Sequence, residues 1–462
     1  MSMMTLRDAA QAMSGQLIGG DAALVGVSTD SRKTRSGELF IALRGETFDG
    51  HGFVATAKAA GCAAAVIDTL APEGLRQLGL PLIVVADTRQ ALGALAAWWR
   101  SRFDIPVVAV TGSNGKTTTK EMITGILRTA FGDAVLANQG NLNNDIGLPL
   151  TLLQLNGGHR AAVIEMGMNH PGEIAYLARI ARPNVAIVTN AQRAHLAGMG
   201  TLETIATEKG SVFMALSKTG VAVINSDDPW ASLWRSQAGG RQVMDFSFEQ
   251  DAFVKGLRYS HGLESRLSIA AQGKTVEVVL SVPGAHNARN ALGAAAVGLA
   301  AGISLDSVRD GLAAFVGVKG RLQRKNGLNG AVVLDDTYNA NPDSVRAGID
   351  VLAATVGRKI LVLGDMGEIG DMTGQFHDEV GGYAKSQGVD RLLAFGESSA
   401  LAAHNFGDGG EHFRKIEDLV AVLSVEMAAG TTVLVKGSRF MRMERVVDAV
   451  LGDGEAKSEG GH

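Results

Sequence analysis

Short apolar runs alternate with longer amphipathic stretches through the middle of the chain. The runs are rich in β-branched residues and lie at residues 107–110, 161–166, 185–190 and 221–225. Uninterrupted apolar runs of this length are typical of strands buried on both faces of a parallel sheet, and the stretches between them have helical spacing. The pattern predicts a central α/β domain at residues 104–318. Polar and apolar residues alternate at 241–283, which predicts antiparallel strands appended to its sheet, and a buried helix is expected at 288–302, capped by 284–287.

A second series of apolar runs follows, with helical stretches between them, at residues 331–336, 359–365, 391–396 and 431–437. This series predicts a doubly wound, Rossmann-like C-terminal domain at residues 319–462. Residues 1–103 have a mixed pattern, with strands expected near 39–43, 64–67 and 82–85 and helices at 6–13 and 88–100, so a small N-terminal α/β domain is predicted. The fold class is therefore α/β, with three domains.

Composition narrows the class of protein. The 462 residues suit about three domains of ~150 residues each. The 43 basic and 47 acidic residues leave the chain almost neutral, which argues against a nucleic-acid-binding surface. Cys62 is the only cysteine, so no internal disulfide can form. No secretory signal or membrane-spanning stretch is recognisable. We expect a monomeric cytoplasmic protein that binds small molecules, with a disordered tail at 452–462.

The strand at 107–110 leads into T-G-S-N-G-K-T-T and then directly into a predicted helix. A glycine-rich turn between strand and helix offers backbone N–H groups and a positive helix end to a phosphate. The longer P-loop pattern requires a glycine where Val110 stands, so the match is the shorter G-x-x-G-K-T. Lys116 is expected on the outer phosphates and Thr117 on magnesium. The predicted nucleotide loop comprises Gly112, Ser113, Asn114, Gly115, Lys116, Thr117 and Thr118.

Other polar side chains stand at predicted strand ends, where ligands gather in parallel sheets. Glu165 ends an apolar strand, and its carboxylate would suit magnesium. His195 follows another strand, although an isolated histidine is typical of a structural residue. Lys209 has the pattern of a solvated helix lysine. The amide-rich stretch 138–149 offers donors and acceptors for a peptide or carboxylate. The clusters at 28–32 and 45–53, taken by themselves, favour solvated turns.

Eleven short motifs, taken together and in order, resemble the Mur ligases, the ATP-dependent amide-forming enzymes of bacterial cell-wall synthesis. They are D-S-R, F-D-G-H, T-G-S-N-G-K-T-T, N-L-N-N-D-I-G-L-P, E-M-G-M-N-H-P-G-E-I, A-H-L, G-A-H-N-A-R-N-A, G-R-L-Q, D-D-T-Y-N-A-N-P-D-S, G-D-M-G-E-I-G and V-K-G-S-R. The fourth and ninth motifs are similar to the dipeptide-adding branch. Two segments depart from the family pattern: E-K-G-S-V-F stands for A-K-G-E-I-F, and N-A-Q-R precedes A-H-L.

The resemblance implies a reaction in which ATP phosphorylates the terminal carboxylate of UDP-N-acetylmuramoyl-tripeptide. The amine of D-alanyl-D-alanine would then displace phosphate and form the amide. By analogy, Lys116, Glu165, His195 and Lys209 are catalytic. One magnesium would be held by Thr117 and Glu165, and a second by His195 and a carbamylated Lys209. Nucleotide contacts from outside the loop would come from Asn290, Arg321, Asp336 and Asn339.

The resemblance also assigns substrate contacts. The N-terminal domain would hold the UDP-sugar through Ser28, Thr29, Asp30, Ser31, Arg32, Phe48, Asp49 and His51. The peptide would meet Asn141, Asn143 and Asn144. Two alternatives stay open: a related amide ligase of the folylpolyglutamate synthase type, which should lack the UDP-binding domain, and a nucleotide-gated switch, whose turnover would ignore amino-acid acceptors. The motifs leave open whether the third residue of the tripeptide is diaminopimelate or lysine.

Overall fold

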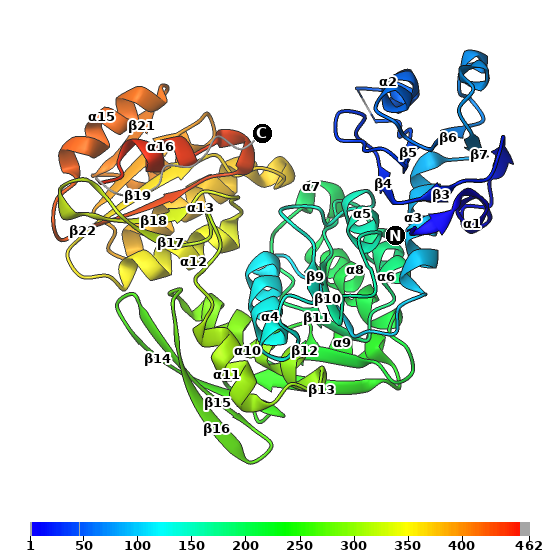
Figure 1. The fold of residues 1–462 in the computed structure, drawn as a ribbon. Helices are drawn as coiled ribbons and strands as arrows, with labels where there is room; N and C mark the ends of the chain where they lie inside the picture. The colour runs from blue at the N-terminus through cyan, green and yellow to red at the C-terminus, as the bar shows by residue number, and fades with distance from the viewer. Residues whose placement is uncertain (1, 46, 453–462) are drawn as a thin grey trace.

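The computed structural model describes residues 2–45 and 47–452, which form three α/β domains (Figure 1). The N-terminal and C-terminal domains lie on opposite sides of the central domain, and each contacts it. This arrangement confirms the α/β fold class and the three-domain prediction. The tail predicted to be disordered lies outside the described residues from 453 onward. No described helix is both long enough and apolar enough to span a bilayer.

The N-terminal domain is built on a five-stranded sheet of order β2-β7-β6-β5-β4. β2 runs antiparallel to β7, and the other neighbours are parallel. The elements are β1 (Met4–Thr5), α1 (Leu6–Ala12), β2 (Gln16–Ile18), β3 (Ala23–Leu24), β4 (Gly26–Ser28), β5 (Glu38–Ile41), η1 (Gly50–Phe53), α2 (Val54–Ala59), β6 (Ala64–Asp68), η2 (Glu73–Leu78), β7 (Leu82–Val85) and α3 (Thr88–Arg100). The predicted strands at 39–43, 64–67 and 82–85 and both predicted helices are confirmed.

The central domain has a nine-stranded sheet of order β16-β15-β14-β13-β12-β11-β8-β10-β9. It is parallel from β9 to β14, and β14, β15 and β16 form an antiparallel extension, as predicted. The elements are β8 (Val107–Thr111), α4 (Lys116–Phe131), β9 (Val135–Ala137), α5 (Gly147–Leu152), β10 (Ala161–Glu165), α6 (Glu173–Ala181), β11 (Val185–Val188), α7 (Leu196–Met199), α8 (Leu202–Met214), β12 (Val221–Asn225), α9 (Ala231–Ala238), β13 (Gln242–Ser247), β14 (Val254–His261), β15 (Glu264–Ala271), β16 (Lys274–Leu280), α10 (Ala285–Ala300) and α11 (Leu305–Ala313).

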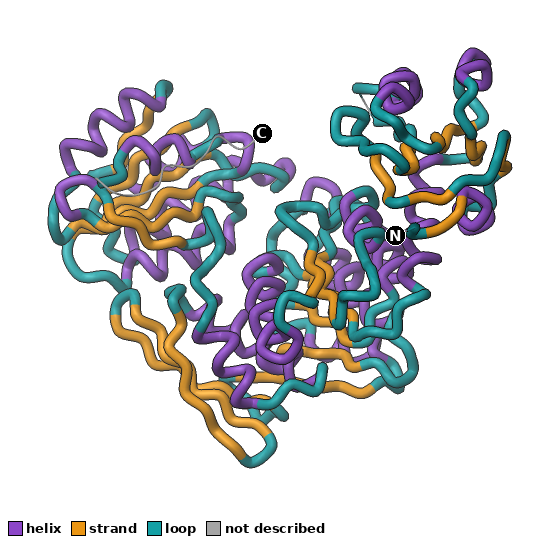
Figure 2. The backbone as a smooth tube through the Cα atoms, viewed as in Figure 1, coloured by secondary structure: helices purple, strands orange, loops and turns teal. Residues whose placement is uncertain are grey.

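The C-terminal domain has a six-stranded sheet of order β17-β18-β22-β19-β20-β21, parallel except for β17 at the edge. The elements are β17 (Gln323–Asn326), η3 (Leu328–Gly330), β18 (Val332–Asp336), α12 (Pro342–Ala353), β19 (Arg358–Gly364), η4 (Gly370–Met372), α13 (Thr373–Ser386), β20 (Arg391–Phe395), α14 (Ser399–Phe406), β21 (Gly410–Phe413), α15 (Ile416–Glu426), β22 (Thr431–Lys436), η5 (Arg439–Met441) and α16 (Glu444–Ala449). Helices cover both faces of this sheet, which confirms the doubly wound prediction (Figure 2).

One boundary prediction is wrong. Residues 284–287 were expected to cap a helix that starts at 288, whereas α10 begins at Ala285 with Gly284 as its N-cap. Gly284 has φ +99, a conformation open mainly to glycine. The helix therefore starts one turn earlier, and His286 and Asn287 belong to its first turn. This start brings both side chains into the wall of the cavity described below.

Candidate functional site

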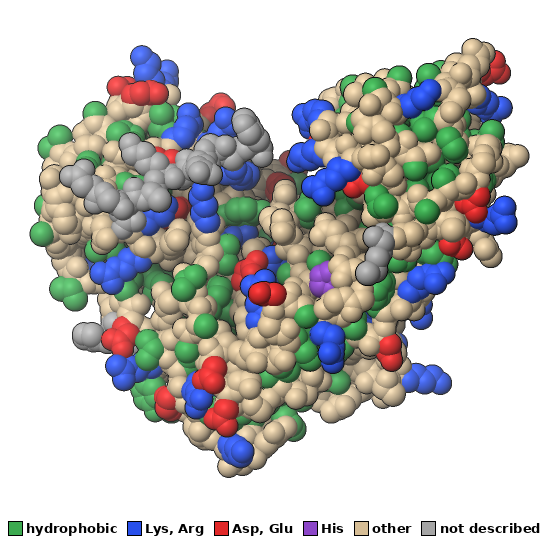
Figure 3. All heavy atoms as spheres, viewed as in Figure 1, with side chains coloured by type: hydrophobic (Ala, Val, Ile, Leu, Met, Phe, Trp, Pro, Cys, Tyr) green, Lys and Arg blue, Asp and Glu red, His purple; other side chains and the backbone are tan. Residues whose placement is uncertain are grey.

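A cavity of about 960 Å³ is lined by residues of all three domains, mainly the central and C-terminal ones. In the space-filling view the surface is hollowed between the two upper lobes (Figure 3). Of the predicted nucleotide-binding residues, the cavity wall contains Ser113, Asn114, Gly115, Lys116, Thr117, Thr118, Asn290, Arg321, Asp336 and Asn339. Only Gly112 of that set is not part of the wall. The structure therefore brings together residues that lie more than 220 positions apart in the sequence.

The loop between β8 and α4 has the geometry of an anion site. Gly112 and Gly115 have φ +148 and +80, and a Cβ on either would overlap the side chain of Thr189 or Asn290. Asn190 accepts the N–H groups of Ser113 (2.9 Å, at its carbonyl) and Asn114 (2.9 Å, at Oδ1). The sequence predicts that the backbone N–H groups of this loop face a phosphate. The N–H groups of Ser113 and Asn114 do not, because Asn190 already accepts them. The first N–H groups of α4 have no acceptor within the helix and face outward from its N-terminus.

Lys116 is folded back on its own loop. Its Nζ donates to the carbonyls of Gly112 (2.8 Å) and Ser113 (3.0 Å). Burial lowers the pKa of the ammonium, while the nearby Glu165 carboxylate works in the opposite direction. An ammonium held only by carbonyl oxygens in a buried site is well matched to a phosphate, which would supply the missing negative charge.

Glu165 ends β10 and is 2% exposed. Its Oε1 accepts a hydrogen bond from Asn143 Nδ2 (2.8 Å), but Oε2 is buried without a partner among the described residues. Asn138 fixes the backbone of Glu165 from the adjacent strand end, because its side chain pairs with both the N–H (2.8 Å) and the carbonyl (2.9 Å). A buried carboxylate oxygen with no donor suits a hard cation, so Thr117 and Glu165 fit a magnesium ion. Asn138 lies in the predicted amide-rich stretch, but sequence reasoning gave it no role of its own.

His195 is not an isolated histidine. Its Nδ1 lies 2.9 Å from Glu368 Oε2 of the C-terminal domain, and this contact lowers the pKa of Glu368. Both side chains line the cavity. No group of three or more His, Cys, Asp and Glu side chains is placed to hold a metal in the described part of the chain. A cation here would therefore need oxygens from a phosphate or water besides protein ligands. Glu368 was missed as a site residue, although it lies in the G-D-M-G-E-I-G motif.

Lys209 is 1% exposed, so the interpretation as a solvated helix lysine is wrong. It lies in α8, outside the cavity wall. Burial lowers the pKa of its amine well below the usual value, and the charge of Lys116 lowers it further. No carboxylate lies within ion-pair distance of it among the residues described. A neutral, buried amine is the form that could react with carbon dioxide, so the side chain fits a carbamate.

The C-terminal wall of the cavity centres on a buried ion pair. Asp336 Oδ2 lies 2.6 Å from Lys436 Nζ, and Asp336 Oδ1 accepts the N–H of Leu322. Burial raises the pKa of Asp336 and lowers that of Lys436, while each partner's charge opposes the shift. The Arg321 guanidinium stacks over the Tyr338 ring at 3.9 Å. Together these groups give the C-terminal wall of the cavity a cationic and aromatic character.

His286 was also missed. It lies in the first turn of α10 and lines the cavity, and burial lowers its pKa to about 4, so the imidazole is neutral at physiological pH. Its signal was the G-A-H-N motif. Asn290 follows one turn later and is buried beside Gly115. Neutral hydrogen-bonding side chains beside the phosphate loop are suited to the sugar or base of a nucleotide.

The predicted sugar-binding residues of the N-terminal domain are not part of the cavity wall. His51 is 1% exposed, with Nδ1 2.6 Å from Asp49 Oδ1 and Nε2 accepting the N–H of Asp68, so both ring nitrogens are used within the domain. Arg32 forms an exposed pair with Asp30 at 2.9 Å. The side chain of Phe48 is largely exposed.

The predicted peptide-binding asparagines do lie in the cavity. Asn141, Asn143 and Asn144 form the end that faces the N-terminal domain, beside Arg89 of α3. Asn144 Oδ1 also accepts the N–H of Gly147 and so fixes the start of α5. The cavity therefore contains both the phosphate loop and an amide-rich end beside the N-terminal domain.

Three family models match the chain. They are the Mur ligase family catalytic domain at residues 24–100, the Mur ligase middle domain at 110–298 and the Mur ligase glutamate ligase domain at 320–439. The UDP-N-acetylmuramoyl-tripeptide–D-alanyl-D-alanine ligase of Escherichia coli K12 is 41% identical, with 98% of this chain and 100% of the relative covered. The enzyme of that name from Bacillus subtilis is 35% identical, with 91% of this chain and 92% of the relative covered.

Solved structures agree with the sequence relatives. Crystal structure I of MurF from Acinetobacter baumannii superposes with a TM-score of 0.89 at 34% identity, covering 96% of this chain and 97% of that one. MurF ligase from Thermotoga maritima in complex with ADP gives a TM-score of 0.81 at 27% identity, covering 92% and 96%. The likeness therefore extends over all three domains.

Proposed function

We propose that this chain, which belongs to the Mur ligase family, joins D-alanyl-D-alanine to UDP-N-acetylmuramoyl-tripeptide with the hydrolysis of ATP, in the cytoplasmic synthesis of peptidoglycan precursors. The observation that carries the proposal is one cavity in which a phosphate loop faces a cationic and aromatic wall and ends in an amide-rich region. Full-length relatives named for this activity support it, as does a similar structure solved with ADP.

The chemistry follows from the groups in the cavity. The terminal carboxylate of the tripeptide attacks the γ-phosphorus of ATP, ADP leaves, and an acyl phosphate forms. The amine of the dipeptide then attacks the acyl carbon, and the amide forms as phosphate leaves. Lys116 and the N-terminus of α4 neutralise charge on the outer phosphates during the first step. Arg321, Asp336 and Asn339 hold the nucleotide from the opposite wall, and Asn141, Asn143 and Asn144 hold the peptide.

We propose two magnesium sites, the second of them on the family resemblance alone. Thr117 and Glu165 would hold one ion, and His195 with a carbamylated Lys209 would hold the other. Bound magnesium supplies positive charge that offsets the negative charge of the transferring phosphoryl group. Asn138 and Asn143 keep the Glu165 carboxylate aimed into the cavity. Domain contact excludes water, which would otherwise hydrolyse the acyl phosphate.

Each of the three domains has its own role in binding the substrates. Residues 1–103 bind the UDP-sugar through Ser28, Thr29, Asp30, Ser31, Arg32, Phe48 and Asp49, while buried His51 holds the shape of that loop. Residues 104–318 bind ATP, and residues 319–462 close over the nucleotide. The chain acts as a monomer. An N-terminal domain that packs against the peptide-binding end counts against a folylpolyglutamate-synthase-like activity, which needs no UDP-sugar.

The test is phosphate release from ATP and magnesium with UDP-N-acetylmuramoyl-tripeptide, with and without D-alanyl-D-alanine. Release that requires both substrates supports the ligase. Release indifferent to the dipeptide supports a nucleotide switch, and release stimulated by glutamate in place of the dipeptide supports the folate-type ligase. Comparing tripeptides that carry diaminopimelate or lysine then defines the third-residue preference.

A further inference from the structure

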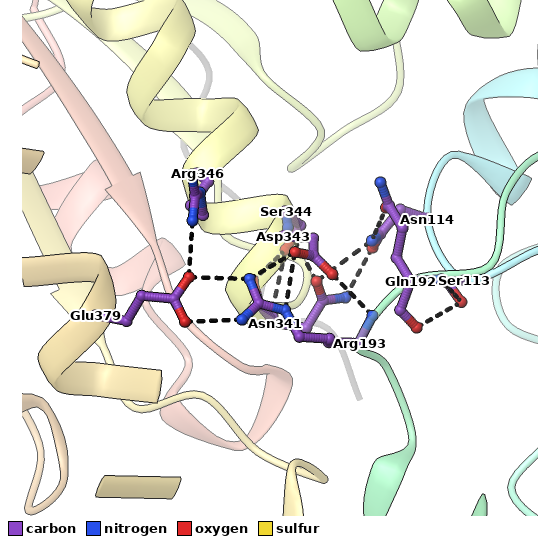
Figure 4. Close-up of polar contacts among 9 residues, drawn as sticks. All are labelled: Ser113, Asn114, Gln192, Arg193, Asn341, Asp343, Ser344, Arg346 and Glu379. Atoms are coloured by element: carbon purple, nitrogen blue, oxygen red, sulfur yellow. Dashed lines mark hydrogen bonds and ion pairs between the residues drawn. The ribbon is translucent and has the colours of Figure 1, made fainter. Parts of the chain in front are cut away.

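Arg193 lies in the loop after β11 and reaches from the central domain to two carboxylates of the C-terminal domain (Figure 4). Its guanidinium donates to Asp343 Oδ1 through Nε (3.0 Å) and Nη2 (2.7 Å). It also donates to both oxygens of Glu379 through Nη1 (2.7 Å) and Nη2 (3.0 Å). The backbone N–H of Arg193 donates to Asp343 Oδ2 at 2.8 Å. One residue therefore makes five hydrogen bonds across the joint between the two domains.

A second contact ties the same joint to the phosphate loop. Asn341 Nδ2 donates to Asn114 Oδ1 (2.7 Å), and Asn114 Nδ2 is shared between Gln192 Oε1 (2.7 Å) and Asn341 Oδ1 (3.3 Å). Gln192 precedes Arg193, and Asn341 lies two residues before Asp343. The two contact sets are therefore neighbours: Asn114 is bonded to the residue before Arg193 and to the residue two before Asp343.

Both carboxylates are held in place from within the C-terminal domain. Asp343 lies in the first turn of α12, where Asn341 and Ser344 form a reciprocal cap. Glu379 Oε1 also accepts a hydrogen bond from Arg346 Nη1 at 2.8 Å. The side chains of Arg193 and Asp343 are each 21% exposed, and that of Glu379 is 28% exposed. Partly buried, preoriented bidentate pairs are stronger and less screened by salt than flexible surface pairs.

We propose that Arg193 is a positioning residue that docks the C-terminal domain on the phosphate loop and so sets the affinity for the nucleotide. This inference rests on the proposed function only for the identity of that nucleotide. A ligand can contact both the phosphate loop and the C-terminal wall of the cavity. The apparent affinity for such a ligand is proportional to the fraction of molecules in which the C-terminal domain is docked. Loss of the Arg193 contacts lowers that fraction and weakens binding, although no atom that touches the ligand has changed.

The experiment compares Arg193→Ala with Arg346→Ala in the full chain. Arg346 also pairs with Glu379, but both lie in the C-terminal domain, so its loss removes none of the hydrogen bonds across the joint. We expect Arg193→Ala to raise the Kd for magnesium-ATP and the KM for ATP about 5- to 50-fold. The kcat at saturating ATP should change less than about threefold, because bound nucleotide restores the docked arrangement. Arg346→Ala should change each constant less than about twofold, and Arg193→Lys should recover only part of the affinity because an ammonium lacks the planar fork.

Small-angle X-ray scattering without nucleotide provides a readout that does not depend on activity. Arg193→Ala should increase the radius of gyration, and Arg346→Ala should not. Glu379→Gln should reproduce part of the Arg193→Ala effect, and the double variant should show less than the sum of the two. If Arg193→Ala fails to fold, Glu379→Gln serves as the second test.

Unchanged nucleotide affinity together with an unchanged radius of gyration in Arg193→Ala would overturn the inference, as would equal effects of Arg193→Ala and Arg346→Ala. These readouts do not depend on the ligase reaction. A protein that binds ATP in an Arg193-dependent way but does not form the amide would overturn the proposed function and leave the docking role intact. A working ligase whose Arg193→Ala variant binds ATP normally would support the proposed function and overturn the docking role of Arg193.

Discussion

The central domain is joined to its two neighbours by contacts of different kinds. Helix α3 of the N-terminal domain packs against α5 and α6, and Leu92 and Leu95 share one apolar core with Leu148 and Leu177. The C-terminal domain has apolar cores of its own. Its joint to the central domain consists mainly of the Arg193 ion pairs, the asparagine contacts and the pair of His195 with Glu368. Two apolar residues of the central domain, Leu196 and Leu263, are partly buried against the C-terminal core.

The difference indicates which domain can move. Separating the N-terminal joint would expose buried apolar surface, at roughly 25 cal/mol for each Å², whereas the polar joint can exchange its hydrogen bonds with water at a small net cost. We therefore expect the N-terminal and central domains to behave as one rigid unit and the C-terminal domain to move on and off it. In this account the apolar joint provides stability, and the polar joint surrounds the chemistry.

The largest expected effect is on activity, at the phosphate loop beside the polar joint. Lys116→Ala should reduce the rate of phosphate release by at least about 10³-fold, because it removes the cation on the outer phosphates. The melting temperature should change little, since the ammonium is buried with its pKa lowered and contributes no favourable ion pair. Steady-state kinetics and thermal unfolding on the same preparation check both parts. A large loss of stability in Lys116→Ala would contradict the assignment of stability to the apolar joint.

The next largest effect is on stability at the apolar joint. Trp99 of α3 is half-buried against the shared core, and its Nε1 donates to the carbonyl of Leu155 in the central domain at 2.9 Å. Trp99→Ala should lower the free energy of unfolding by about 2–4 kcal/mol, because it leaves a cavity and an unpaired carbonyl. Trp99→Phe keeps the ring and should lose only about 1 kcal/mol. Urea unfolding measures both, and equal values for the two variants would contradict the packing account.

A smaller effect concerns pH and the loop that carries Arg193. Asp228 accepts the N–H groups of Trp230 and Ala191, and burial raises its pKa to about 6, with the charge of Arg289 working against the shift. A carboxyl whose pKa is higher in the folded state stabilises the fold when protonated, so this contribution falls as pH rises from about 4 to about 6. Asp228→Asn should gain stability relative to wild type across that window, on the order of 2 kcal/mol. Urea unfolding at pH 4.5 and 7.5 measures the difference, and a constant difference would contradict the assignment.

The smallest stability effect is expected at the exposed cluster of the N-terminal domain. The Arg32 side chain is 85% exposed in its pair with Asp30. Arg32→Ala should change the free energy of unfolding by less than about 0.5 kcal/mol. The KM for the UDP-linked tripeptide should nevertheless rise several-fold, because the cluster contacts the UDP-sugar in our proposal. Lys33→Ala is the control of equal charge, and an unchanged KM in Arg32→Ala would remove this cluster from the substrate site.

The sequence predicts most of the fold where local signals are strong. The helix at 88–100 and the strands at 82–85 and 221–225 have the predicted bounds, because buried apolar runs and an aspartate N-cap mark them. β2 and β17 were not predicted. β2 has only three residues and β17 is entirely polar, and both are edge strands whose antiparallel pairing comes from tertiary contact. The early start of α10 depends on the backbone conformation of Gly284, which no periodicity reveals.

The site was predictable in its residue types more than in its contacts. The phosphate loop and Glu165 could be placed because a strand precedes each polar residue. Three contacts join residues from different elements or domains. They are the hydrogen bonds of two loop N–H groups to Asn190, the pair of His195 with Glu368 and the pairing of Arg193 with Asp343. Such contacts depend on how the domains pack, and a single sequence gives no measure of that.

The most direct test of the central claim follows an oxygen atom. The tripeptide substrate is labelled with ¹⁸O in its terminal carboxylate, converted with ATP, magnesium and D-alanyl-D-alanine, and the released phosphate is analysed by mass spectrometry. An acyl phosphate carries one carboxylate oxygen into phosphate, so the account predicts one ¹⁸O in each phosphate released and one amide formed with it. Phosphate released without the label would contradict activation of the carboxylate by ATP and, with it, the assignment of this cavity as a ligase site.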